Sequence, residues 1–178
     1  SGGTITITNA SDLTIAAAAN LTLDGLFNQD GSGDVALSSD ITTSGDNVSF
    51  AGAITLGDAV AIDTTSGGSG TGGDVTLSST LDGGSTFTVD AGSGGDLVVT
   101  GAVGVSAPLT SITVSESTDV TFSNALNLSG ALDTTGTGTT TLTGAASAGS
   151  FDVTATTGIV ASSTLTATGG GNISLASD

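Results

Sequence analysis

Apolar residues alternate with Ser, Thr and other small residues along most of the chain, in pairs separated by a single residue. This period of two is typical of a β-strand with one buried face. No long segment has helical spacing, and Gly, Ser and Thr are poor helix formers. The pairs are Ile5/Ile7, Leu13/Ile15, Leu21/Leu23, Val35/Leu37, Val48/Phe50, Ile54/Leu56, Val60/Ile62, Val75/Leu77, Phe87/Val89, Leu97/Val99, Val103/Val105, Ile112/Val114, Val120/Phe122, Leu126/Leu128, Phe151/Val153 and Ile173/Leu175. The pattern predicts an all-β protein.

The pairs recur in triplets, which indicates a repeating unit of three short strands. The expected first strands of the triplets start at Leu13, Val35, Ile54, Val75, Leu97, Val120, near Thr140 and near Ile159. Their period of roughly 20 residues is that of a solenoid. We therefore predict a parallel β-solenoid, or β-helix, of about eight coils with three short strands per coil.

The alternative is an antiparallel meander, which would favour tight hairpin turns such as Asn-Gly. The chain contains no Asn-Gly pair, and its glycine tracts are short enough to be corners. We expect one continuous domain over 1–178. Neither end has an obvious cap, so we expect the chain either to continue on both sides or to stack end to end with copies of itself.

The composition excludes several classes of function. The chain has no Lys, Arg, His or Cys and carries 17 acids, for a formal charge of −17. It cannot neutralise the phosphates of nucleic acids or anionic lipids, and it lacks the usual catalytic bases and the N and S ligands of zinc. Its longest apolar run, Ile15 to Ala19, is too short to span a membrane. We expect no enzymatic activity. Oxygen ligands remain, and these suit Ca²⁺.

Five aspartates precede expected first strands: Asp12, Asp34, Asp74, Asp96 and Asp119. If the coils stack in register, these carboxylates lie one above another, and adjacent charges repel by about 1 kcal/mol in water. One hypothesis is that each carboxylate accepts a hydrogen bond from a turn N–H. The other is that the column binds Ca²⁺ through carboxylate and carbonyl oxygens. No other cofactor is expected.

Runs of alternating threonines suggest a further, more remote function. They lie at Thr4/Thr6/Thr8, Thr86/Thr88, Thr137/Thr139/Thr141/Thr143, Thr154/Thr156 and Thr164/Thr166/Thr168. Flat arrays of threonine on a β-solenoid are similar to ice-binding faces. Because these runs are not expected to recur on one face of successive coils, β propensity and solubility explain them better.

Three segments resemble a known group of proteins: Gly73-Asp-Val-Thr-Leu-Ser-Ser79, Thr118-Asp-Val-Thr-Phe-Ser-Asn124 and Ala131-Leu-Asp-Thr-Thr-Gly-Thr-Gly-Thr-Thr-Thr-Leu-Thr-Gly144. They are similar to the repeats of giant bacterial surface proteins of the filamentous-haemagglutinin-like type. This resemblance implies a secreted, right-handed β-helix that serves as a surface fibre or adhesin stalk. We therefore expect an extracellular structural segment, with a Ca²⁺-dependent adhesive module as the alternative.

Overall fold

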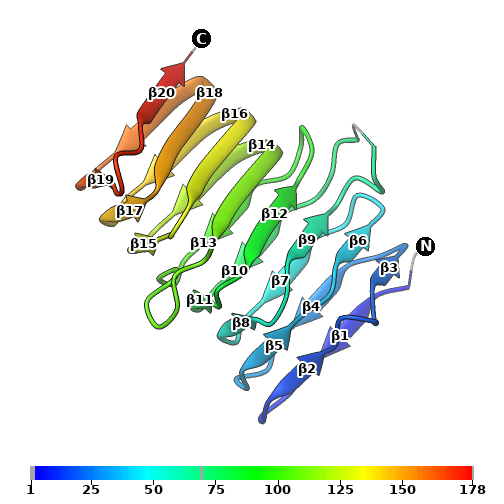
Figure 1. The fold of residues 1–178 in the computed structure, drawn as a ribbon. Helices are drawn as coiled ribbons and strands as arrows, with labels where there is room; N and C mark the ends of the chain where they lie inside the picture. The colour runs from blue at the N-terminus through cyan, green and yellow to red at the C-terminus, as the bar shows by residue number, and fades with distance from the viewer. Residues whose placement is uncertain (1–2, 69, 178) are drawn as a thin grey trace.

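Parallel strands wind around one axis in the computed structural model, which describes residues 3–68 and 70–177. Each coil contributes strands to three faces, and about eight coils stack along the axis (Figure 1). Every pairing between the strands of these ranges is parallel, and the described residues contain no helix. The predicted all-β parallel solenoid is therefore confirmed. The alternative fold, an antiparallel meander, is excluded for these residues by the parallel pairing.

The three faces are named in chain order, starting from the strand nearest the N-terminus. The first face consists of β1 (Ile5–Ile7), β4 (Phe27–Gln29), β7 (Val48–Phe50), β10 (Val75–Leu77), β13 (Leu97–Val99) and the C-terminal parts of β14 (Ser111–Phe122), β16 (Ala131–Leu142) and β18 (Ser150–Ala161). The second face consists of β2 (Leu13–Ile15), β5 (Val35–Leu37), β8 (Ile54–Leu56), β11 (Leu81–Asp82), β15 (Leu126–Asn127), β17 (Ala146–Ala148) and β19 (Leu165–Ala167). The third face consists of β3 (Leu21–Leu23), β6 (Ile41–Thr43), β9 (Val60–Asp63), β12 (Thr86–Asp90), the N-terminal parts of β14, β16 and β18, and β20 (Ile173–Ser177).

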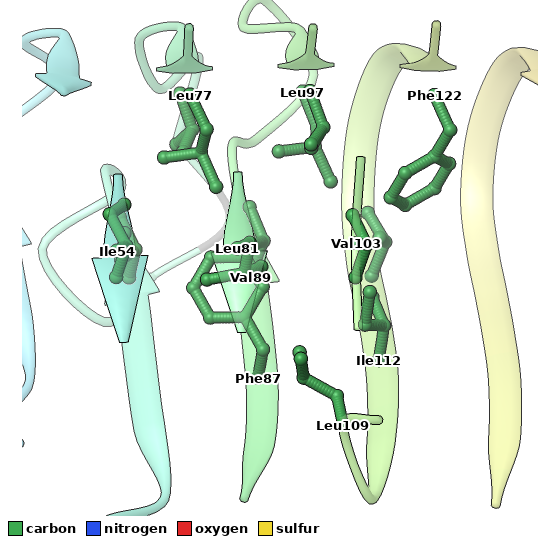
Figure 2. Packing of buried hydrophobic residues seen from close by; sticks show 14 of the residues in the cluster. Ile54, Leu77, Leu81, Phe87, Val89, Leu97, Val103, Leu109, Ile112 and Phe122 are labelled. Carbon is green, nitrogen blue, oxygen red and sulfur yellow. The ribbon is translucent and has the colours of Figure 1, made fainter. Parts of the chain in front are cut away.

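Both apolar residues of nearly every pair point into the solenoid, where they stack on their counterparts from the next coil. Figure 2 shows Leu77, Leu97 and Phe122 of the first face directed toward the side chains of the other two faces. The rings of Phe27 and Phe50 pack with their centroids 5.1 Å apart. Burial of these columns is the main source of stability, because about 25 cal/mol is gained per Å² of apolar surface removed from water.

The predicted phase of the repeat was wrong in its first half. Leu13, Val35 and Ile54 pair with one another on the second face, whereas Val75 pairs with Val48 and Leu97 on the first face. The error hid one long coil, in which corresponding residues Asn47 and Asp74 are 27 positions apart. The pairs look alike on all three faces, so a slip from one face to the next left the apparent period almost unchanged.

One predicted strand pair also differs in the structure. Val103 is buried and makes isolated parallel bridges to Leu81 and Leu126, but Val105 is 65% exposed. The chain leaves the second face after Val103 in a loop fixed by Asp82, whose Oδ1 accepts hydrogen bonds from the amides of Ser106 (2.8 Å) and Ala107 (3.2 Å). Alternation over two apolar residues was too short a signal to separate this loop from a strand.

Candidate functional site: the carboxylate columns

The corner between the third face of one coil and the first face of the next is here called the third corner. Asp74, Asp96 and Asp119 occupy equivalent positions on it, each directly before a first-face strand. The same column begins at Asn47 and continues to Thr139. Strand pairing sets the spacing of successive members at about 4.8 Å. The strand register therefore aligns these three of the five predicted aspartates one above another.

The side chains of this column form a ladder of hydrogen bonds between coils. Oδ1 of Asn47 accepts from the amide of Asp74 at 2.9 Å. Oδ1 of Asp74 accepts from the amide of Asp96, and Oδ1 of Asp96 from the amide of Asp119, both at 3.1 Å. Oδ1 of Asp119 accepts from the amide of Thr139 at 2.6 Å. Bonds from N–H groups to ionised carboxylates are stronger than neutral ones, so they offset the repulsion within the column.

Asp12 and Asp34 do not belong to this column. They precede β2 and β5 on the second face, where Ala53 occupies the next equivalent position. The two carboxylates line an open cavity of about 250 Å³ together with Thr14 and Thr55. The prediction of a single five-aspartate column was therefore wrong, because the phase of the repeat was misassigned for the first three coils.

The third corner carries a second acidic column that the sequence analysis missed. Asp90 is paired with Asp63 in the preceding coil and with Glu116 in the following coil. Oδ1 of Asp63 accepts hydrogen bonds from N and Oγ1 of Thr65, both at 2.7 Å, and Oδ1 of Asp90 accepts from the amide of Gly92 at 3.0 Å. Asp63 and Asp90 each directly follow an apolar pair, but a register shift places Glu116 two residues after Val114, so the spacing does not continue through the column.

Over residues 3–68 and 70–177, no three acidic side chains converge closely enough to form a metal-binding group. In the first column, one oxygen of each aspartate is directed to a backbone amide of the next coil. The carboxylates therefore accept hydrogen bonds from amides, as the first hypothesis proposed, but these amides belong to the next coil and not to the same turn.

A buried glutamine also joins coils and was not recognised from sequence. Gln29 is 1% exposed and takes the inward position that an apolar residue holds elsewhere in the column. Its Nε2 donates to Asn9 Oδ1 (2.6 Å) and Gly31 O (2.7 Å), and its Oε1 accepts from the amides of Ala51 and Gly52, both at 2.9 Å. All four hydrogen-bonding positions of the amide are therefore occupied. The sequence does contain a signal for this inward position, because Gln29 lies two residues after Phe27 and so falls on the same face of the strand.

The outward row of the first face is chemically mixed. Its members are Thr6, Asn28, Ser49, Thr76, Val98, Thr121, Thr141 and Val160. Threonine recurs there but does not form an unbroken array, in agreement with the expectation from the sequence. The row is also free of charge, unlike the third corner.

The described part of the chain contains no helix that could cross a membrane. No protein-family model, curated protein or solved structure matches the chain. What the geometry establishes is a β-solenoid repeat fold with carboxylate columns along one corner.

Proposed function

We propose that this chain is a structural repeat segment of an extracellular or cell-surface fibre, such as an adhesin stalk, of the filamentous-haemagglutinin-like type. The observation that carries the proposal is the uninterrupted stacking of coils around a continuous apolar core. Eight coils at about 4.8 Å each give a rod on the order of 40 Å long. The role is mechanical and not catalytic, and the partners are flanking coils of a longer chain or further copies of this one.

The surface composition supports an extracellular rod. Outward positions are mostly Ser, Thr and Asn, which form a solvated β-surface without basic groups. The net charge of −17 keeps neighbouring rods apart in water, with an effect that decreases as salt rises.

Single-molecule stretching tests the mechanical role directly. The chain is placed between two marker domains and pulled along its length. Coils that detach one at a time give repeated force peaks, each releasing about 20 residues or roughly 70 Å of contour. The same molecule pulled in denaturant supplies the baseline. A featureless extension indistinguishable from that baseline would refute the proposal.

A second candidate is a Ca²⁺-dependent adhesive module. It is favoured by the cavity on the second face, where Asp12 and Asp34 lie one coil apart beside two threonine hydroxyls. Carboxylate and hydroxyl oxygens are suitable ligands for Ca²⁺. If the ion binds there, Ca²⁺ raises the melting temperature and EDTA reverses the increase.

The variant Asp34→Asn removes one ligand charge from this cavity and should abolish the Ca²⁺-dependent shift. Asp58→Asn, which removes the same charge elsewhere on the surface, is the matched control and should retain it. Identical melting curves of the unmodified chain with Ca²⁺ and with EDTA would eliminate this candidate.

A further inference from the structure

The two ends of the solenoid leave inward-facing apolar side chains open along the axis. Ile173 and Leu175 of β20 are 46% and 43% exposed, whereas their partners Phe151 and Val153 in the coil before are 1% and 0% exposed. The inward residues of the first coil, apart from Ile15, are only partly buried, although the inward residues of the second coil are fully buried. In Figure 1 no described segment lies across either end.

The same ends carry unpaired strand edges. β1, β2 and β3 each pair with a strand on one side only, and so do β19 and β20 at the opposite end. A strand with one free edge presents N–H and C=O groups that can pair with a further strand. Each end therefore offers both apolar side chains and backbone groups in three places around the axis.

The cross-sections of the two ends are complementary in register. The first coil presents Ile5-Thr-Ile7, Leu13-Thr-Ile15 and Leu21-Thr-Leu23, and the last presents Ile159-Val-Ala161, Leu165-Thr-Ala167 and Ile173-Ser-Leu175. Stacking one on the other repeats the internal pairing, with small alanines opposite larger isoleucines on two faces. A similar combination exists inside the rod, where Ala146 lies between the larger Leu126 and Leu165.

Charge and strand direction favour one polarity of contact. Residues 159–177 of the last coil contain no acid, although Asp178 follows them in the sequence, and the first coil contains Asp12 and Asp24. Contact between two first coils would bring these carboxylates together. Contact between two last coils would avoid that repulsion, but a twofold axis would make the facing strands antiparallel. Only contact of a last coil with a first coil keeps the parallel register and also keeps Asp12 and Asp24 of two copies apart.

We propose that this 178-residue chain associates head to tail with further copies of itself, the last coil of one copy pairing in parallel β-register with the first coil of the next. Such a heterologous contact does not close on itself and gives an open filament. The inference rests on the proposed function as a rod and names the surfaces and the polarity by which rods would join.

Two blocked variants test both the contact and its polarity. Ile173→Asp/Leu175→Asp places charges on the last coil, and Leu21→Asp/Leu23→Asp places charges on the first coil. An unpaired charge buried in the contact should weaken association by more than about 100-fold. The unmodified chain should form particles that grow with concentration, and each blocked variant alone should be monomeric in analytical ultracentrifugation.

An equimolar mixture of the two blocked variants is the decisive sample. Each variant keeps one intact end, so the mixture should form a one-to-one dimer and grow no further. Thr141→Asp/Ser147→Asp adds the same charge on the outer faces and should assemble like the unmodified chain. Hydrogen exchange of the central strands in each monomer establishes that the variants are folded.

Three results would overturn the inference. An unmodified chain that stays monomeric at its solubility limit has no such contact. Growth of either blocked variant alone places the contact on a lateral face, and failure of the mixture to dimerise excludes head-to-tail polarity. Discrete rods of single-copy length that still show stepwise force peaks would refute the stacking and leave the proposed mechanical function intact.

Discussion

The third corner is built in two ways along the rod. In the long coil between β9 and β10 it is a loop, closed by Thr64, whose Oγ1 donates to Gly73 O and accepts from the Gly73 amide, both at 2.9 Å. From Ser111 onward the strands β14, β16 and β18 run through the corner without a break (Figure 1), with Ser117, Thr137 and Ala155 inside it. The loop corner is therefore held by side chains and glycine conformations, whereas the strand corner is held by backbone pairing.

The two designs also differ in the length of the connection. Equivalent residues are 27 positions apart in the long coil but 20 apart between Asp119 and Thr139. The connections within β14, β16 and β18 stay extended, so their N–H and C=O groups find partners in the adjacent coils. A long connection must fold back, and its polar groups need side-chain partners. The two kinds of corner should therefore respond differently to equivalent substitutions.

Replacing a glycine should give the largest difference in stability between the loop corner and the strand corner. Gly72 has φ of +62°, and an added Cβ would clash with the carbonyl oxygen of Ala91. We expect Gly72→Ala to destabilise the chain by about 2–4 kcal/mol, through the strained φ and the forced backbone shift. Gly158→Ala, in the strand corner of β18 with open space around it, should be neutral or stabilising by up to about 1 kcal/mol. Urea unfolding midpoints measure both, and equal midpoints would contradict the distinction between corners.

Loss of the loop closure should have the next largest effect. Thr64→Val keeps the shape of a fully buried residue but leaves the N–H and C=O of Gly73 without their side-chain partner. We expect a loss of about 1–3 kcal/mol and faster hydrogen exchange in the 64–73 loop. Unchanged exchange there would show that the hydroxyl does not close the corner.

The stability that the carboxylate ladder provides should depend on its hydrogen-bond acceptors and not on their negative charge. Asp96→Ala removes the acceptor of the Asp119 amide and should cost about 1 kcal/mol. Asp96→Asn keeps an acceptor, as Asn47 does at the start of the column, and it relieves repulsion from Asp74. Its urea midpoint should match or exceed that of the unmodified chain. If Asn is as damaging as Ala, the negative charge itself is required, which would favour bound cations.

The smallest expected change in stability is a gain and not a loss. Thr134 lies in the strand part of β16, is 0% exposed, and has no hydrogen-bond partner for Oγ1 among the described residues. Replacing this hydroxyl with a methyl group in Thr134→Val removes an unpaired buried polar group at constant shape. We expect a gain of about 0.5–1 kcal/mol in the same urea assay. A loss would mean that an unseen partner, such as water, satisfies the hydroxyl.

The features that depend on the alternation of apolar and polar residues could be predicted from the sequence. Branched apolar pairs located most strands and the period predicted the solenoid, because burial of every second side chain is a local property of a strand. The phase of the coils was not predictable in the same way. It depends on which of three equivalent faces a pair joins, and the extra residues before Val75 could be assigned to a corner only once the strand partners were known.

The candidate site was predicted in part for the same reason. Asp74, Asp96 and Asp119 lie in coils of similar length, so their alignment was visible, whereas Asp12 and Asp34 were assigned to the wrong face. The closing role of Thr64 was not recognisable, since its partner Gly73 is nine positions away across a loop. Side-chain hydrogen bonds across a corner leave no periodic trace in the sequence.

The hydrogen-bond ladder also bears on how the rod can grow in length. Its partners are 20 to 27 positions apart at every step, from Asn47 to Thr139. The entropy of closing a loop depends on the logarithm of loop length, so each added coil costs about the same as the one before it. Folding then becomes a chain of equal local steps, whose difficulty does not increase with the number of repeats. A gene for such a protein can lengthen by duplication without making its product slower to nucleate.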